Sequence, residues 1–360
     1  MPEVSTDPRV EDPKSRGGVT GPQATLLRLA YGAQAAQVIY VAAKLSLADQ
    51  LKDGARSSAD LAGAAGVDAV ILRRVLRCLA SLGVLIETAP DRFGLTEMGQ
   101  LLRSDRPDSL QPRAIWNTEV MLPLWGSLLH TLHTGESGAA HVLGMPLYDY
   151  LTAHPDIGAL FDRTMAGYAR YRLAPVIAAY DFSRFGSIVD VGGGNGALLI
   201  EILRAYPQPR GIVFDLPPVA ERARQNIATA GLSDRCIAVG GSALETVPAG
   251  GDAYVLSNFL IGMSGEEAIQ ILRHCRRGMS AGGRVLLIEW VVPTGAELAS
   301  GSFKAWDTTS IDLTILSTGA GRVRTADEFQ AVLHAAGLTT MEIVPTASSV
   351  SVIEAGSAHQ

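Results

Sequence analysis

The chain has 360 residues, which at roughly 150 residues per domain predicts two domains, and its 47% of apolar residues are enough to give each domain a core. Thirty basic and 36 acidic residues leave a net charge of −6, so we expect no nucleic-acid partner. No apolar run approaches the roughly eighteen residues that a membrane span needs, so we expect a soluble, cytoplasmic protein without a membrane partner.

The amino-terminal third is predicted to contain a tail and a winged-helix domain. Residues 1–22 have no apolar core and are predicted to form a disordered tail, whereas residues 23–51 carry apolar residues at helical spacing, as an interface helix does. Residues 57–102 predict a helix, a turn, a second helix capped by Asp68, and a short hairpin. Apart from three arginines, the second helix is apolar or small, which argues against DNA binding. We place the winged-helix domain at residues 23–110.

The remainder of the chain falls into a helical part and an alternating part. Residues 111–180 are predicted to form a helical linker, and its many aromatic residues are expected to line a substrate pocket. Over residues 181–357, strand and helix signals alternate, and the last two strands resemble a hairpin. This alternation predicts an α/β fold with a Rossmann-like, doubly wound and mostly parallel sheet.

A glycine-rich turn follows the first strand of this sheet. Asp190 lies in the strand, Gly192, Gly194 and Gly196 lie in the turn, and Asp215 ends the next strand, where it could accept ribose hydroxyls. A nicotinamide dinucleotide site would have the spacing GxGxxG, with a pyrophosphate at the helix N-terminus. An acid before the turn suits the cationic tail of an amino acid better than a pyrophosphate. The residues therefore favour S-adenosylmethionine as the cofactor, with a dinucleotide as the alternative.

The chain resembles the caffeic-acid-type O-methyltransferases, which include enzymes of bacterial secondary metabolism. Matching segments run in order over about residues 140–356, with weaker likeness from residue 25, and include GMPLYDYLTAHPDIGALFDRTM, IVDVGGGNGALL, VFDLPPV and GRVRTADEFQAVLHAAGL. The family joins a winged-helix dimerisation domain to a Rossmann-like domain that binds S-adenosylmethionine. The resemblance thus implies a homodimer formed through the amino-terminal domain and a small-molecule substrate.

The resemblance also implies roles for individual residues. Asp190, Gly192 and Gly194 would surround the methionine part of the donor, and Asp215 with Leu216 would hold its ribose and adenine. The adenine would also lie near Ser242, Ala243 and the backbone of Ser257, and the acceptor pocket would be lined by Trp125, Met165, Tyr168, Ile261, Asp312 and Thr318. Ordinary core packing is the alternative for each residue of the acceptor pocket.

The sequence departs from the family at three places. Ser242 and Ala243 replace the Asp and bulky residue that follow the third strand, so no carboxylate is available there. Ile261 stands where the family has its histidine base, and Val323 stands where a glutamate would orient that histidine. Only Glu289 remains of the family's catalytic set, and an acid/base role, an orienting role and a structural role are all open for it.

These departures leave two functions open. Positioning alone can supply on the order of 7 to 11 kcal/mol to a displacement, whereas a general base contributes typically 10²- to 10⁴-fold, so methyl transfer does not require the histidine. We predict methyl transfer to a small aromatic or polyketide-like metabolite through proximity and orientation. The alternative is a non-methylating step, such as hydroxylation, cyclisation or a pericyclic reaction. The resemblance includes an anthracycline-tailoring branch that lacks the histidine and has a hydroxylating member.

Three histidines lie close together in the sequence. His130, His133 and His141 fall within twelve residues, at the end of a predicted helix and in the GESG loop that follows. Metal binding needs ligands that converge, and the spacing alone does not provide this. We expect solvated or packing histidines here and predict no metal.

Overall fold

The computed structural model describes residues 21–319 and 321–357, without the side chains of residues 166 and 168–171. The chain divides into two compact units, residues 1–105 and 106–360. Of the predicted tail, only Gly21 and Pro22 are described; the remainder lies outside the described residues, and Pro22 already begins the first helix. No helix in the described ranges is long and apolar enough to cross a membrane.

The first unit has the predicted winged-helix pattern. Its small sheet pairs β3 with both β1 and β2 in antiparallel fashion. The prediction of a single helix over residues 23–51 is wrong. The helix is interrupted at Tyr31 and again at Ser46, whose φ of 50° is left-handed. Its elements are α1 (Pro22–Ala30), α2 (Gly32–Lys44), α3 (Leu47–Gln50), β1 (Arg56–Ser57), α4 (Ser58–Ala65), α5 (Ala69–Ser81), β2 (Leu85–Ala89), β3 (Arg92–Leu95) and α6 (Glu97–Gln100).

The second unit begins with a group of helices, as the sequence predicts. They are α7 (Gln111–Trp116), a π-helical turn (Asn117–Met121), α8 (Leu122–Gly126), α9 (Leu128–Thr134), α10 (Gly138–Leu143), α11 (Leu147–Ala153) and α12 (Pro155–Ala179). Aromatic residues form part of their core, and the rings of Trp116 and Phe161 lie 5.1 Å apart.

A mixed sheet follows, in the order β10-β11-β8-β7-β4-β5-β6, and β9 pairs with β8 off this path. Strands β4 to β8 pair in parallel, and β10 and β11 form the expected antiparallel pair at one edge. The strands are β4 (Ser187–Val191), β5 (Arg210–Asp215), β6 (Cys236–Gly240), β7 (Gly251–Ser257), β8 (Met279–Val292), β9 (Arg324–Thr325), β10 (Leu338–Pro345) and β11 (Val350–Ser357).

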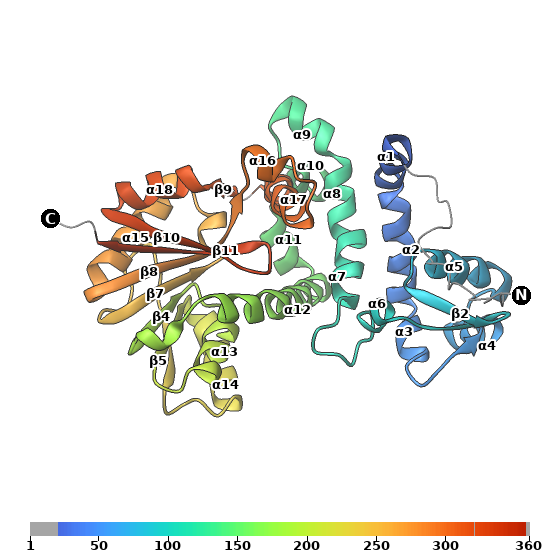
Figure 1. The fold of residues 1–360 in the computed structure, drawn as a ribbon, viewed down its shortest axis with the longest axis horizontal. Helices are drawn as coiled ribbons and strands as arrows, with labels where there is room; N and C mark the ends of the chain where they lie inside the picture. The colour runs from blue at the N-terminus through green and yellow to red at the C-terminus, as the bar shows by residue number, and fades with distance from the viewer. Residues whose placement is uncertain (1–20, 320, 358–360) are drawn as a thin grey trace, which may run out of the picture. The chain divides into compact units, whose positions relative to one another are not determined.

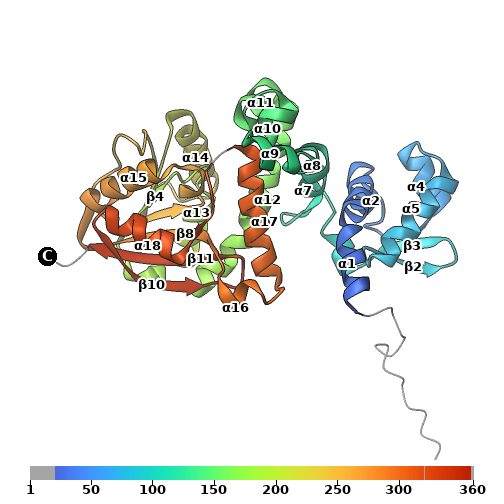
Figure 2. The same cartoon turned by 90° about the horizontal axis from the view of Figure 1, so that it is seen from above.

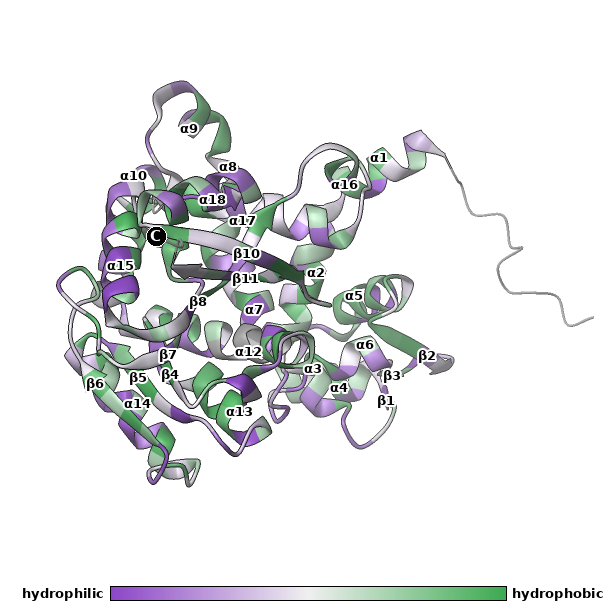
Figure 3. Ribbon diagram, turned by 60° about the vertical axis from the view of Figure 1, so that its left-hand side comes forward, coloured by the Kyte–Doolittle hydropathy of each residue, from purple (hydrophilic) through white to green (hydrophobic). Residues whose placement is uncertain are grey.

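Helices cover both faces of this sheet (Figure 1). One buried cluster joins the sheet to α12, α13 and α14, and a second joins it to α15 and α18. The two helices α13 and α15 differ in hydropathy (Figure 3). Helix α13 is largely hydrophobic, whereas α15 carries hydrophilic residues on part of its surface. The remaining helices are α13 (Ala197–Ala205), α14 (Pro217–Thr229), α15 (Gly265–Gly278), α16 (Gly295–Leu298), α17 (Phe303–Thr318) and α18 (Ala326–Ala335).

Candidate functional site

The candidate site lies at the carboxyl ends of the central strands. Strand β4 pairs in parallel with β5 on one side and with β7 on the other, so the loops after these strands meet at one edge of the sheet. Chain connections run outward in both directions from β4, and in doubly wound sheets ligands bind at such a switch point. The predicted glycine turn leaves the sheet at this point.

The glycine turn is held by backbone hydrogen bonds to the neighbouring strand. The N–H groups of Gly192 and Gly193 both donate to the carbonyl of Phe214, at 2.8 and 3.3 Å. Gly192 has a φ of 69°, and a Cβ there would lie 2.3 Å from the ring of Phe259. Glycine is therefore required at position 192 both by its backbone conformation and by the ring that covers it.

The carboxylate of Asp190 is buried behind this turn, with 1% of the residue exposed. Neither of its oxygens has a hydrogen-bond partner among the described residues. Burial, and to a lesser extent the charge of Asp215, raises the pKa of Asp190 to about 7. A buried acceptor without a partner is costly, and a cationic ligand group would satisfy it. This carboxylate therefore suits the positively charged methionine part of S-adenosylmethionine.

Asp215 is fixed in place by two backbone N–H groups. Gly194 donates to its Oδ2 at 2.8 Å, and Leu216 donates to its Oδ1 at 2.7 Å. Each carboxylate oxygen can accept a further hydrogen bond, so Asp215 remains able to receive two ribose hydroxyls. The turn expected to surround one end of the donor thus also orients the acid expected at the other end.

A cavity of about 190 Å³ opens beside Asp215. Of the residues expected around the donor, its lining contains Gly192, Asp215, Leu216, Ser242 and Ala243. The lining also includes residues that sequence reasoning missed: Phe214, Gly241, Leu244, Phe259 and Met263. Phe214 lies in the segment VFDLPPV, which resembles the family, and Phe259 and Met263 lie on either side of Ile261 in the sequence. The mostly apolar walls suit an adenine ring.

Three of the residues expected around the donor do not belong to this lining: Asp190, which lies buried behind the glycine turn, Gly194 and Ser257. Ser257 ends β7, and its Oγ accepts a hydrogen bond from Asn258 Nδ2 at 3.3 Å. Its proposed backbone contact with adenine remains a prediction.

The turn over residues 260–263 contains Ile261, which stands where the resemblance puts the family's histidine base. Glu289 Oε1 accepts the N–H of Leu260 at 3.0 Å, and Arg324 donates to the carbonyls of Leu260 and Met263 at 2.7 and 2.9 Å. Arg324 is buried and was missed by sequence reasoning, although it lies in the GRVRT segment. Ile261 is also held here, because its carbonyl accepts the N–H of Arg322 at 3.0 Å.

The surroundings of Glu289 shift its pKa in opposite directions. Burial raises its pKa to about 8, while the Leu260 N–H and the positive charges of Arg324 and Arg172 act in the opposite direction. Its hydrogen bond to the backbone of Leu260 favours the orienting role over a direct catalytic one.

The expected acceptor residues come together in part. Asp312 of α17 accepts the N–H of Val323 at 2.9 Å, which places it beside the segment that holds Ile261. Thr318 ends α17, and its hydroxyl donates to the carbonyl of Ile315. Figure 2 shows α17 alongside the helices α8 and α10, against which it packs. Trp125 of α8 is half-buried against the core of the helical group.

The other two acceptor candidates lie on α12. Met165 is half-buried, and the side chain of Tyr168 lies outside what the structure describes. Their contact with an acceptor therefore remains a prediction.

Comparisons with known proteins agree on one family. Family models of an O-methyltransferase domain and of an O-methyltransferase dimerisation domain match residues 125–339 and 27–105. The phenazine O-methyltransferase PhzM of Lysobacter antibioticus is 41% identical over 341 residues, which cover 95% of this chain and 98% of the relative. The 3-amino-4-hydroxybenzoate 4-O-methyltransferase of Streptomyces cremeus is 38% identical over 316 residues, which cover 87% of this chain and 84% of the relative.

A solved structure extends this agreement to three dimensions. The structure of CalO1, a methyltransferase in calicheamicin biosynthesis in its SAH-bound form, matches with a TM-score of 0.82 and 33% identity. The match covers 93% of this chain and 98% of CalO1.

The affinity for S-adenosylmethionine is expected to rise with pH up to about 7 and then to level off. Below that pH the carboxyl of Asp190 is protonated in the free protein, and binding a cation expels the proton, so each pH unit changes the association constant by up to about tenfold. Titration calorimetry from about pH 5.5 to 8.5 measures this slope. Asp190→Asn should bind more weakly at pH 8 and lose the slope, while the exposed control Asp234→Asn should keep it. A slope that persists in Asp190→Asn would contradict the assignment.

Two replacements of Glu289 separate orientation from proton transfer. Glu289→Gln keeps an oxygen that accepts the Leu260 N–H, so we expect turnover within about tenfold of the parent, whereas a lost general base would cost typically 10²- to 10⁴-fold. Glu289→Ala leaves that N–H unpaired, and the free energy of unfolding should fall by about 1–3 kcal/mol. Turnover rates and denaturant unfolding check both. A large loss in Glu289→Gln with unchanged stability would assign Glu289 to the chemistry.

Proposed function

The chain belongs to the O-methyltransferase family and is an S-adenosylmethionine-dependent methyltransferase, and we propose that it methylates an acidic hydroxyl group on a small aromatic metabolite. The observation that carries the donor assignment is the unpaired, buried carboxylate of Asp190 beside the glycine turn. The acceptor class is supported by relatives named for phenazine and aminohydroxybenzoate O-methylation, at 41% and 38% identity.

The residues divide the work of methyl transfer between holding the donor and aligning the acceptor. When bound, the donor would supply a sulfonium methyl group for transfer to the acceptor oxygen, with the electrons of the carbon–sulfur bond returning to sulfur. Asp190 would hold the positively charged end of the donor, and Asp215 would hold its ribose. The walls formed by Phe214, Phe259 and Met263 exclude water from the adenosine. Such fixed geometry makes the displacement effectively unimolecular.

The missing base determines which acceptors react well. The side chain of Ile261 cannot take a proton, so the acceptor must lose its proton to solvent. An ordinary phenol has a pKa of about 10 and stays protonated near neutral pH, whereas a hydroxyl on an electron-poor ring, whose pKa lies near or below 7, exists largely as the oxyanion and needs no further activation. The turn that carries Ile261 remains rigidly held by Glu289 and Arg324, which preserves the alignment without the base.

The first experiment is an assay with two aromatic probes, a hydroxyphenazine and 3-amino-4-hydroxybenzoate. We expect one S-adenosylhomocysteine for each methylated product, measured by mass spectrometry, and a rate that follows the ionisation of the acceptor. Ile261→His should raise the rate at pH values where the acceptor is protonated and leave it unchanged where the acceptor is ionised, with Ile261→Val as the control. If the donor binds but is not consumed while a probe is oxidised or rearranged, methyl transfer is contradicted and the non-methylating alternative is supported.

We also propose a homodimer formed through the amino-terminal unit. The match to a dimerisation domain over residues 27–105 supports it, as do large apolar side chains exposed on α1 and at its end: Leu26, Leu27, Leu29 and Tyr31. Exposed apolar groups of this kind mark interaction surfaces.

A charge placed on α1 should weaken the dimer. Leu29 is 73% exposed, so Leu29→Asp is expected to leave the fold intact while moving the equilibrium toward the monomer. Sedimentation equilibrium measures the shift, and Gln23→Asp on the same helix adds the same charge as a control. If both variants and the parent have the same dimer dissociation constant, the proposal that α1 lies in the dimer interface is contradicted.

A further inference from the structure

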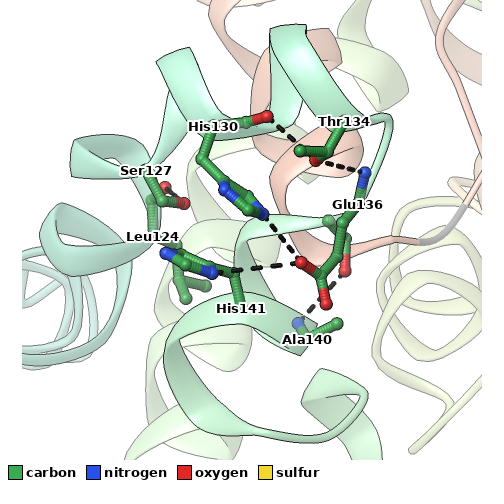
Figure 4. A network of polar contacts seen from close by, with 8 residues as sticks. Leu124, Ser127, His130, Thr134, Glu136, Ala140 and His141 are labelled. Carbon is green, nitrogen blue, oxygen red and sulfur yellow. Dashed lines mark hydrogen bonds and ion pairs between the residues drawn. The ribbon is translucent and has the colours of Figure 1, made fainter.

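Three metal-binding side chains converge where α9 turns into α10. His130 lies on α9, Glu136 lies in the turn, and His141 lies on α10 (Figure 4). One oxygen of Glu136 lies 2.7 Å from Nε2 of His130 and 3.9 Å from Nδ1 of His141. One ligand atom from each residue lies within 4.8 Å of the other two. The sequence pattern of histidines missed this cluster because it gave no role to Glu136.

The backbone of the turn holds this cluster in place. The hydroxyl of Thr134 donates to the carbonyl of His130 at 2.9 Å and accepts the N–H of Glu136 at 3.1 Å (Figure 4). Ser137 caps α10 by accepting the N–H of Ala140 at 3.2 Å. These bonds fix the positions of the two helix ends, so the three side chains can meet a common ion once one imidazole ring rotates out of the stack and both rings point a nitrogen at it.

The two histidine rings face the same carboxylate. They stack with centroids 3.7 Å apart and planes within 16°. His130 is hydrogen-bonded to Glu136, and His141 approaches the same carboxylate oxygen while its ring stacks on His130. The ligand atoms of all three residues thus gather at one place, where a cation would replace the His130–Glu136 hydrogen bond.

We propose that Zn²⁺ binds between His130, Glu136 and His141. Tetrahedral ligands at about 2.0–2.1 Å from zinc lie about 3.4 Å from each other, and the observed 2.7 and 3.9 Å bracket this value. Two imidazoles with one carboxylate suit zinc better than Mg²⁺ or Ca²⁺, which prefer oxygen ligands. The side chains are 30%, 47% and 45% exposed, so an ion can enter and water can complete the coordination.

A metal ion at this site would link α9 to α10. At the start of α10, a Cβ on Gly138 would lie 2.7 Å from Ser127 Oγ and 3.2 Å from the carbonyl of Ser317. The turn that carries Glu136 therefore leads directly into a close contact with the carboxyl end of α17, where Thr318 lies. Bound zinc fixes α9 to α10 and thereby stabilises this contact. The proposal does not depend on methyl transfer.

Calorimetric titration of the full-length, untagged and chelator-treated protein with ZnCl₂ tests the site. We expect one saturable ion per chain at these ligands, and at least a tenfold weaker affinity in His141→Ala and in Glu136→Gln. His133→Ala, on the same helix as His130 but outside the cluster, should bind as the parent does. Because Cys78 is exposed and thiols bind zinc, every protein in the series carries Cys78→Ser.

Thermal unfolding gives a second, independent readout. Zinc should raise the melting temperature of the parent and of His133→Ala, and should not do so in His141→Ala. Glu136→Gln keeps an oxygen that can bond to His130, so it tests the site even if a histidine variant fails to fold. The proposal is overturned if the parent binds no zinc, or if His141→Ala and Glu136→Gln bind it as tightly as the parent.

Discussion

The buried carboxylate of Asp190 is the constraint on which the rest of the site depends. Its strand lies between β5 and β7, so the side chain is enclosed by the sheet, and neither oxygen finds a partner among the described residues. Because burial raises its pKa to about 7, ionisation costs folding stability as the pH rises from the range of an unfolded carboxyl towards 7. A ligand that brings a positive charge to this point would remove the cost. If Asp190 holds the donor as we propose, donor binding and folding stability are coupled through one side chain.

The turn over residues 260–263, where the resemblance places the family's base, is held by two buried side chains. Glu289 binds the backbone N–H of Leu260, and Arg324 binds two carbonyls of the same turn. Both side chains are buried, so the turn is held from two sides by polar groups that are themselves shielded from water. The frame that would position a histidine thus persists around Ile261. A fixed frame supports methyl transfer by alignment, with deprotonation left to the chemistry of the acceptor.

Helix α17 connects the two functional regions of the second unit. It carries Asp312, which binds the backbone N–H of Val323 near the turn at 260–263, and its carboxyl end contacts the start of α10. A metal ion between α9 and α10 would therefore act on the helix that carries two of the expected acceptor residues, Asp312 and Thr318. In the proposed function, the donor is held at strand ends and the acceptor by helices.

The sequence by itself determined the α/β class, the winged-helix pattern, the glycine turn with its two acids, and the absence of a base at Ile261, because each is a local pattern or a resemblance carried by contiguous motifs. It did not reveal the break at Ser46, the cover that Phe259 places over Gly192, or the role of Glu136 between two histidines. Only the tertiary structure decided that Asp190 has no hydrogen-bond partner in the described part of the chain, and that Arg324 reaches Leu260 across 64 positions. Such contacts depend on how distant segments pack, and neither spacing nor composition records that packing.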